Sequence, residues 1–244
     1  MRRSSGWTRT VASQPCARAG AGRDIETNDR VLSAVILGIL ASGEGTTLQA
    51  LLDACAREEL VAQVGVVISN NSASGALRRA AAAGVACAHL SSKTHPEPAE
   101  LDAAIRSCLE GHGVDLVVLA GFLKKLGPLT LSAYGGRILN THPALLPKFG
   151  GPGMFGQHVH RAVLAAGDAV SGASVHVVTA EYDTGPILAQ RTVPVHLDDT
   201  ADILAERVQT AERALLVDFI AEVASGARRL SALGRGEFPR RAPA

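Results

Sequence analysis

Short apolar runs alternate with helical stretches along most of this chain, and this alternation limits the possible folds more than any other feature. Runs rich in Val, Ile and Leu predict strands near residues 34–40, 63–69, 85–90, 114–119, 136–140, 172–178 and 187–195. Apolar residues with helical spacing predict helices near 47–58, 74–83, 97–111, 157–166 and 200–224. The pattern favours an α/β fold, a Rossmann-like wound sheet with right-handed crossovers. The sheet is expected to be mostly parallel, with antiparallel strands in the C-terminal part, where residues 181–185 join the last two.

The two ends of the chain differ in charge from its middle. A chain of 244 residues with 47% apolar content can bury a sizeable core, and one domain is expected over residues 31–225. Residues 1–30 lack periodicity and carry a net charge of +3, and 226–244 form a basic tail of +4, so both are expected to be disordered. Because the whole chain carries +1, the segment between them carries −6. An acidic folded part argues against a nucleic-acid substrate.

Neither a membrane anchor nor a disulfide framework is indicated by the sequence. The longest apolar runs are too short to span a bilayer, and the Arg-rich N-terminus lacks the apolar centre of a secretory signal. The four cysteines, Cys16, Cys55, Cys87 and Cys108, show no Cys-x-x-Cys spacing. Buried thiols in a cytoplasmic protein are the expectation.

Residues 138–147 and 183–186 gather an amide, an imidazole and a carboxylate beside strand-like runs. Asn140 can donate a hydrogen bond to an oxygen that gains negative charge, and His142 can supply or stabilise a proton nearby. Asp183 can orient that imidazole and favour its charged form. These groups suit attack on a carbonyl. An isolated Asn-x-His after a strand is, however, usually turn chemistry.

Five segments, in order along the chain, resemble the folate-dependent formyltransferases. Residues 140–148, Asn-Thr-His-Pro-Ala-Leu-Leu-Pro-Lys, look like the signature of that family, and 183–186, Asp-Thr-Gly-Pro, match its second motif. Residues 41–50 are similar to the phosphate loop of the members that formylate glycinamide ribonucleotide, and 119–123 and 208–212 also fit. The resemblance covers about residues 34–224. Five motifs in the family's order are far more specific than any one of them.

The resemblance implies a reaction and a cosubstrate. In these enzymes 10-formyltetrahydrofolate carries the formyl group on N10, and the amine of the acceptor attacks it to give a tetrahedral intermediate. The implied acceptor is glycinamide ribonucleotide, in purine synthesis, so both partners are small molecules. Asn140 falls on the position that donates to the formyl oxygen, and His142 on the one that stabilises the oxyanion as a cation. Asp183 falls on the position that holds His142 and helps relay the proton of the amine through water.

The glycines of the first loop invite comparison with a dinucleotide-binding site. The third glycine of that fingerprint would fall at Leu48, and the second strand ends in residues 68–71, Ile-Ser-Asn-Asn, without the acid that holds a ribose hydroxyl. The chain also lacks the Gly-Lys-Ser/Thr of a P-loop. Both nucleotide sites are therefore excluded.

An anion site at the start of the first helix fits the same loop. Gly45, Thr46 and Thr47 can offer backbone N–H groups and hydroxyls to a monophosphate, where the helix dipole favours negative charge. The alternative is a helix N-cap in which Thr46 or Thr47 satisfies the backbone. The family usually has Asn where Thr47 stands, which leaves the contact of this side chain open.

Two further segments are expected to bind the substrates. Leu123, Lys124, Lys125 and Leu126 match the family's folate-binding segment, where backbone groups face the pterin; Asn140 borders the same slot. The alternative for residues 123–126 is an ordinary turn after a buried strand. Gln209 and Glu212 lie at i and i+3 and share one helix face, where they can meet a ribose and an amine together. A solvated polar face is the alternative there.

The remaining histidines predict no metal site. His158 and His160, at i and i+2, would point about 200° apart on a helix and cannot share one ion. His176 alternates with two valines on a predicted strand, which favours a structural role. The Gly-rich residues 150–156 read as a flexible flap near the site.

Other activities share the Asn-x-His and Asp motifs. A methionyl-tRNA formyltransferase would need a further C-terminal RNA-binding domain, and a formyltetrahydrofolate deformylase an N-terminal regulatory one; neither is expected here. The phosphate loop also favours a phosphorylated small acceptor. A non-catalytic, anion-binding α/β module is the alternative from another class. Loss of the formyl group from 10-formyltetrahydrofolate, with and without acceptor, would separate these possibilities.

Overall fold

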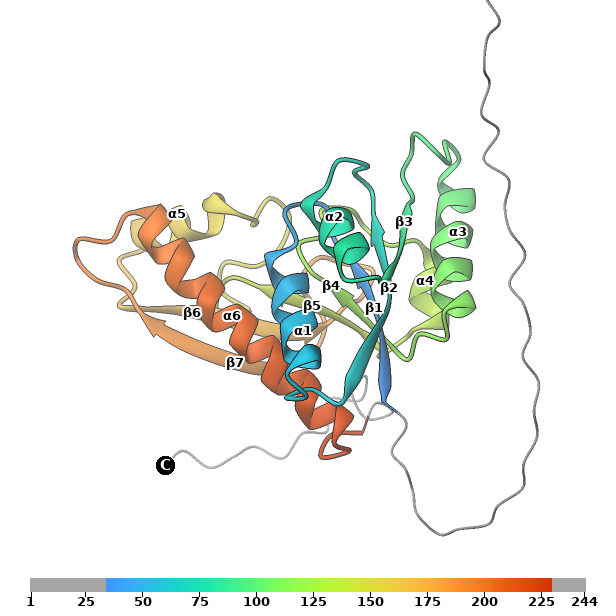
Figure 1. Ribbon diagram of the computed structural model, residues 1–244. Helices are drawn as coiled ribbons and strands as arrows, with labels where there is room; N and C mark the ends of the chain where they lie inside the picture. Colours follow the sequence, from blue (N-terminus) through green and yellow to red (C-terminus); the bar gives the residue numbers. More distant parts are fainter. Residues whose placement is uncertain (1–33, 230–244) are drawn as a thin grey trace, which may run out of the picture. The chain divides into compact units, whose positions relative to one another are not determined.

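A computed structural model describes residues 34–229, in which seven strands form one sheet in the order β3-β2-β1-β4-β5-β6-β7 (Figure 1). The strands are β1 (Val35–Leu40), β2 (Ala62–Ser69), β3 (Ala86–His89), β4 (Leu116–Leu119), β5 (Ile138–His142), β6 (Val170–Val177) and β7 (Ile187–Pro194). The helices are α1 (Thr46–Ala56), α2 (Gly75–Ala82), α3 (Pro98–Gly111), α4 (Pro128–Ala133), α5 (Gln157–Ala165) and α6 (Ala201–Ala224). The expectations for residues 1–30, and for 226–244 apart from its first four residues, lie outside the described range. The expected domain ends, near 30 and 225, remain predictions.

The strand pairing confirms a wound, mostly parallel sheet. Strands β1 to β5 pair in parallel, whereas β5 with β6 and β6 with β7 pair antiparallel. The chain winds outward from β1 in one direction through β2 and β3, and then in the other through β4 and β5. The strand order therefore reverses between β1 and β4. Open α/β sheets form their binding crevices at the carboxyl ends of the strands on either side of such a reversal.

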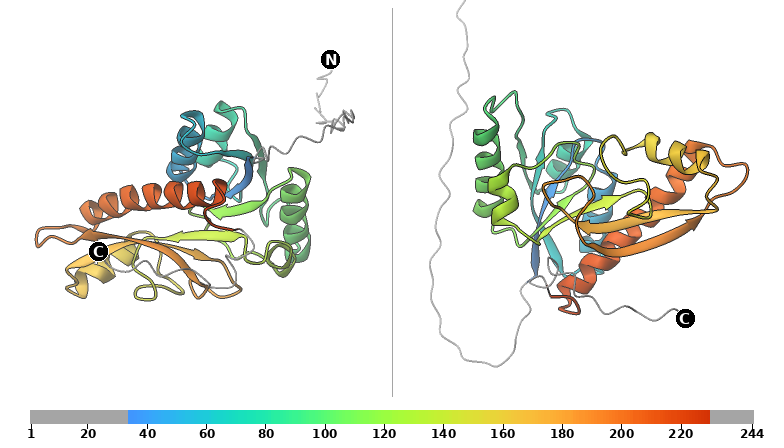
Figure 2. Two further views of the ribbon diagram at one scale, coloured as in Figure 1. Left: turned by 90° about the horizontal axis from the view of Figure 1, so that it is seen from below. Right: turned by 180° about the vertical axis from the view of Figure 1, so that it is seen from behind.

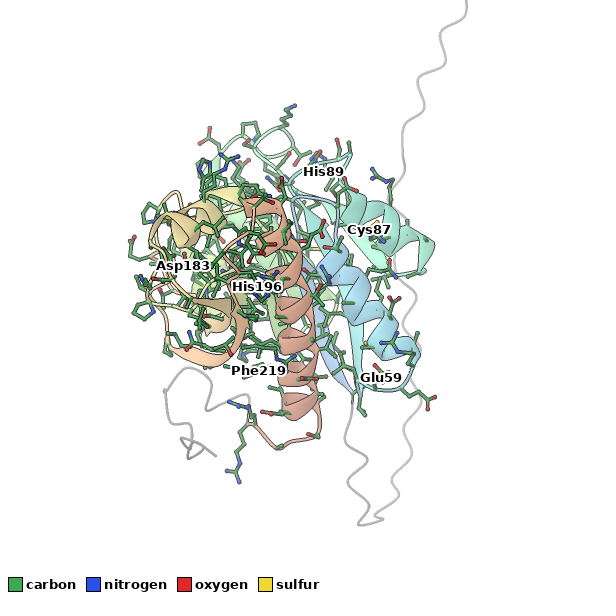
Figure 3. The ribbon with its side chains drawn as sticks, turned by 90° about the vertical axis from the view of Figure 1, so that its left-hand side faces the viewer. Glu59, Cys87, His89, Asp183, His196 and Phe219 are labelled. Atoms are coloured by element: carbon green, nitrogen blue, oxygen red, sulfur yellow. The ribbon has the colours of Figure 1, made fainter. Side chains whose placement is uncertain are left out.

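Helices cover both faces of the sheet and complete two apolar cores. On one face Leu51 of α1 and Phe219 of α6 are buried with the inward side chains of the central strands. Figure 3 labels Phe219 on α6. On the other, Leu109 of α3 and Tyr134, just after α4, are buried against the same strands. All four residues of β4 are buried because they have helices on both sides, which explains its continuous apolar run.

Helix α6 runs along β6 and β7 and reaches the carboxyl end of β5 (Figure 2). Its N-terminus is fixed by Thr200, whose hydroxyl accepts a hydrogen bond from the Ile203 amide at 3.3 Å. Leu215, Leu216 and Phe219 anchor its middle in the core, so the turn before them, with Glu212, is held above the end of the sheet. Within residues 34–229, no helix is long and apolar enough to cross a membrane.

Two elements differ from the sequence-based prediction. Strand β5 continues to His142 instead of ending at residue 140, because antiparallel pairing with β6 extends to the pair His142 and Ser174. Helix α4 was not predicted. Its six residues are too few to show periodicity, and its first amides, those of Leu129 and Thr130, donate to the carboxylate of Asp102 on α3 at 2.7 and 3.1 Å. The capping group is thus distant in sequence.

Candidate active site

A cleft of about 550 Å³ opens at the carboxyl ends of β1, β4 and β5. It brings together most of the predicted site residues, from five separate segments: Gly45, Thr46, Thr47, Leu123, Asn140, His142, Asp183, Gln209 and Glu212. The other three, Lys124, Lys125 and Leu126, line a smaller pocket of about 70 Å³ that shares Phe122, Asn140, Tyr182 and Asp183 with the cleft. The two adjoining pockets together contain all twelve predicted catalytic and substrate-binding residues.

His142 and Asp183 form the predicted imidazole–carboxylate pair across the cleft floor. His142 Nδ1 lies 3.5 Å from Asp183 Oδ2, and His142 Nε2 lies 2.7 Å from the carbonyl oxygen of Phe149. Asp183, labelled in Figure 3, accepts a hydrogen bond from the Gly151 amide at 2.9 Å. The Gly-rich segment, expected to be a flap, thus contacts Asp183, and the residue just before it contacts His142. The ring has an oxygen beside each nitrogen, an arrangement that suits an imidazolium.

His176 is the functional candidate that sequence reasoning missed. Its Nε2 atom lies 3.0 Å from Asn140 Nδ2 and 3.4 Å from Asp183 Oδ1, and its Nδ1 lies 3.0 Å from the Val177 carbonyl. The antiparallel register of β5 and β6 places Asn140 directly opposite His176. The alternation with valines correctly indicated burial, but the contact with Asn140 depends on a register that the sequence does not reveal.

Burial and charge act in opposite directions on the two acid–base groups. Burial lowers the pKa of His142, and although Asp183 and the Phe149 carbonyl raise it, the pKa stays below its ordinary value. Burial raises the pKa of Asp183, but the His176 side chain beside it, the hydrogen bond from the Gly151 amide and the charges of both histidines outweigh burial and lower that pKa. At neutral pH the free protein therefore holds a neutral imidazole beside a carboxylate. The expected cationic His142 would have to form during the reaction.

The start of α1 presents its amides to the cleft. Gly45 is the N-cap residue, with φ of 73°, and among the described residues no side chain caps this helix. Thr46 and Thr47 occupy its first turn and line the cleft. The alternative, in which one of these threonines caps the helix, is therefore wrong. An uncapped helix N-terminus favours an anion.

Gln209 and Glu212 face the cleft from α6, as their spacing predicted. Gln209 is exposed, whereas Glu212 is partly buried and accepts a hydrogen bond from the hydroxyl of Thr141 at 2.5 Å. Burial raises the pKa of Glu212, while this hydrogen bond and the charge of Arg213 act against the rise. The alternative of a freely solvated polar face does not describe Glu212.

Comparison with known proteins tests the resemblance over the whole fold. The profile of the formyl transferase family matches residues 36–220. The chain belongs to the formyl transferase family. The phosphoribosylglycinamide formyltransferase of Escherichia coli (strain K12) is 40% identical over 188 residues, which are 77% of this chain and 86% of that protein. The Mycobacterium tuberculosis (strain CDC 1551 / Oshkosh) protein of the same name is 42% identical over 189 residues, 78% of this chain and 85% of its own.

A solved structure agrees with this family assignment. The crystal structure of glycinamide ribonucleotide transformylase 1 from Symbiobacterium toebii matches with a TM-score of 0.74 and 39% sequence identity, and the match covers 80% of this chain and 89% of that one. The resemblance of the five segments to folate-dependent formyltransferases is thereby confirmed, as is the Rossmann-like fold.

The expected folate segment of this formyl transferase follows β4. The amide of Leu123 donates to the Ser42 hydroxyl at 3.0 Å, while its side chain is 59% exposed at the cleft. Lys125 Nζ lies 3.2 Å from Glu181 Oε2 and 4.8 Å from the ring centroid of Tyr182, so it joins this segment to the loop that carries Asp183. Leu126 is buried against the core. Leu126 thus anchors the end of the segment in the core, and folate binding by its three exposed residues stays a prediction.

His158 and His160 both lie on α5, with His158 exposed and His160 buried and lining the cleft. Burial lowers the pKa of His160, and the charge of His142 acts in the same direction. Across residues 34–229, no three His, Cys, Asp or Glu side chains are grouped so that they could hold a metal ion.

Gly45→Ala is expected to destabilise the fold. A Cβ on Gly45 would lie 2.7 Å from Cα of Ala76 on α2, and the residue has a positive φ of 73°. Strain and overlap should cost about 1–3 kcal/mol, or roughly 2–12 °C in Tm. Gly43→Ala is the matched control, since within the described residues no atom of another segment lies within 4 Å of its added Cβ. Thermal unfolding measures the Tm of both variants. Equal Tm values would show that α2 shifts to make room for the added methyl group without loss of stability.

Proposed function

We propose that this chain transfers the formyl group of 10-formyltetrahydrofolate to the amine of glycinamide ribonucleotide in purine synthesis. The observation that carries the proposal is one cleft that joins the His142–Asp183 pair to the uncapped start of α1. The first can perform acyl transfer and the second can bind a monophosphate. Relatives named phosphoribosylglycinamide formyltransferase at about 40% identity support it. We also propose a cytoplasmic location and no nucleic-acid partner, from the cysteine pattern and the acidic middle of the chain.

The proposed reaction starts from a neutral His142. The amine nitrogen attacks the formyl carbon, a C–N bond forms, and the formyl oxygen becomes an oxyanion to which Asn140 donates a hydrogen bond. Because Nε2 contacts the Phe149 carbonyl, a neutral ring carries its proton there and leaves Nδ1 to take the proton of the amine, through water. The imidazolium then faces Asp183 and stabilises the oxyanion. The bond from carbon to N10 breaks as the carbonyl re-forms, and N10 receives that proton.

The substrates would take up opposite ends of the cleft. The phosphate of the acceptor would bind the amides and hydroxyls of Gly45, Thr46 and Thr47, with its ribose or amine at Gln209 and Glu212. The folate would lie along Leu123, Lys124, Lys125 and Leu126, where the smaller pocket opens beside Asn140. This order brings the formyl carbon and the amine together at His142.

A spectroscopic transfer assay tests the proposal. Wild-type protein with 10-formyltetrahydrofolate should release tetrahydrofolate only when glycinamide ribonucleotide is added, in equal amounts with formylated acceptor. The dephosphorylated acceptor should show a much higher KM, because the α1 site would be unused. Release without acceptor would indicate a deformylase. No release under saturating substrates would favour the non-catalytic anion-binding module.

A further inference from the structure

Thr141 stands between Asn140 and His142 on β5 and faces the opposite side of the sheet. Successive side chains alternate along a strand, so Thr141 shares its face with Leu139, which is buried in the core beneath α6. Thr141 itself is only 8% exposed. A hydroxyl thus occupies a position where the packing of β5 against α6 would accept an apolar side chain. Its partner explains why a polar group can lie there.

The partner of Thr141 is the carboxyl group of Glu212. Oγ1 of Thr141 donates to Oε1 of Glu212 at 2.5 Å, a short hydrogen bond between a hydroxyl and a carboxyl group. Glu212 comes one turn before Leu215 and Leu216, which are anchored in the core, so its backbone is held in place. The hydroxyl then fixes the remaining freedom of the side chain.

Glu212 also lines the cleft, beside Gln209 and Arg213. A carboxylate has two oxygens and about four acceptor sites, so the bond from Thr141 leaves capacity for a ligand. Other titratable groups on the cleft wall are Glu44, His142, His160, Tyr182 and Asp183. Without Thr141, a partly buried carboxylate would lose a hydrogen bond to its charged form and would be free to rotate.

We propose that Thr141 is a positioning residue: its hydroxyl holds one oxygen of Glu212 so that the carboxylate presents its remaining acceptor sites to a hydroxyl or amine of the acceptor substrate. The inference rests on the proposed function for the identity of that substrate, but the contact between Thr141 and Glu212 stands independently of it. Thr141, which lies between the two proposed catalytic residues in the sequence, thus acts on the acceptor side of the cleft.

Thr141→Val tests the proposal, because valine keeps the shape and the β-branch and removes the hydroxyl. The KM for glycinamide ribonucleotide should rise about 10-fold, as for loss of a hydrogen bond to a charged group, with the KM for 10-formyltetrahydrofolate and kcat nearly unchanged. Thr141→Ser should restore the acceptor KM. Thr192→Val, an exposed threonine on β7, is the matched control and should change neither KM. In a Glu212→Gln background, Thr141→Val should add little.

A titration of ligand-free protein separates this proposal from the proposed function. With ¹³C-labelled glutamate, and the Glu212 signal assigned by its loss in Glu212→Gln, Thr141→Val should raise the pKa of Glu212 and Thr141→Ser should not. If wild-type protein transfers no formyl group, the proposed function fails, and the titration still tests the contact. An unmoved Glu212 pKa in Thr141→Val, or an unchanged acceptor KM in an active enzyme, would overturn the positioning role.

Discussion

Asp183→Asn is expected to lower kcat by about 10²-fold or more and to change both KM values little. The substitution keeps the shape and removes the charge that lies 3.5 Å from His142 Nδ1. In the proposed reaction this charge stabilises an imidazolium that exists only after the amine has attacked. The lost interaction therefore belongs to the transition state rather than to bound substrate.

A double-mutant cycle on kcat distinguishes a catalytic pair from two independent residues. His142→Ala in the Asp183→Asn background should cost little more, because groups that act as a unit are not additive. Asp218→Asn, on α6, is the matched control, since it removes an exposed charge paired with Arg191 outside the cleft. If the two substitutions lower kcat by independent factors, or if Asp183→Asn keeps a near wild-type kcat, then Asp183 is only a structural turn residue.

The pH dependence of the same variant follows from the direction of the shifts. Burial already lowers the pKa of His142, and the charge of Asp183 partly offsets this, so Asp183→Asn should lower that pKa further. A reaction that starts from neutral imidazole gains rate as pH rises through the pKa of His142. The acidic limb of kcat should therefore move to lower pH in Asp183→Asn, when measured from about pH 5 to 8. A shift to higher pH would contradict the role of Asp183 in raising the pKa of His142, and a rate that fell as pH rose through this pKa would contradict a neutral starting state.

Sequence patterns predicted those parts of the fold that local physics determines. Within residues 34–229, all seven strands and five of the six helices follow from apolar periodicity, because each buries a stripe or a face whose spacing is visible in the sequence. Helix α4 does not, since its capping carboxylate comes from Asp102 on another helix. The extension of β5 to His142 depends on pairing with β6. Tertiary partners determined both features.

The candidate site divides in the same way. Chemical character and resemblance picked out Asn140, His142 and Asp183, and the structure brings them into one cleft. The contact of His176 with Asn140 depends on the register of two strands, 36 positions apart, and that of Thr141 with Glu212 spans 71. Contacts between residues so far apart in sequence leave no pattern in the local sequence around either residue. The sequence also does not show that a Cβ at Gly45 would overlap with α2, because α2 approaches this loop only in the folded chain.

Asn140→Leu is expected to reduce kcat by about 10²–10³-fold, the usual cost of losing one oxyanion donor. Nδ2 of Asn140 lies 3.0 Å from His176 Nε2, and Asn140 lines both the cleft and the folate pocket. An amide nitrogen carries two hydrogens, so one can serve His176 while the other faces the formyl oxygen.

Asn140→Asp separates the donor from the shape of the side chain. An aspartate of the same size accepts where the amide donates, and it adds a negative charge where the oxyanion develops, so kcat should fall at least as far as in Asn140→Leu. If the amide only packed against His176, the aspartate would retain most of the rate. Single-turnover formyl transfer at saturating substrates measures the chemical step in each variant. Asn140→Asp with near wild-type kcat would show that the formyl oxygen is stabilised elsewhere, and His142 would then have to stabilise it alone.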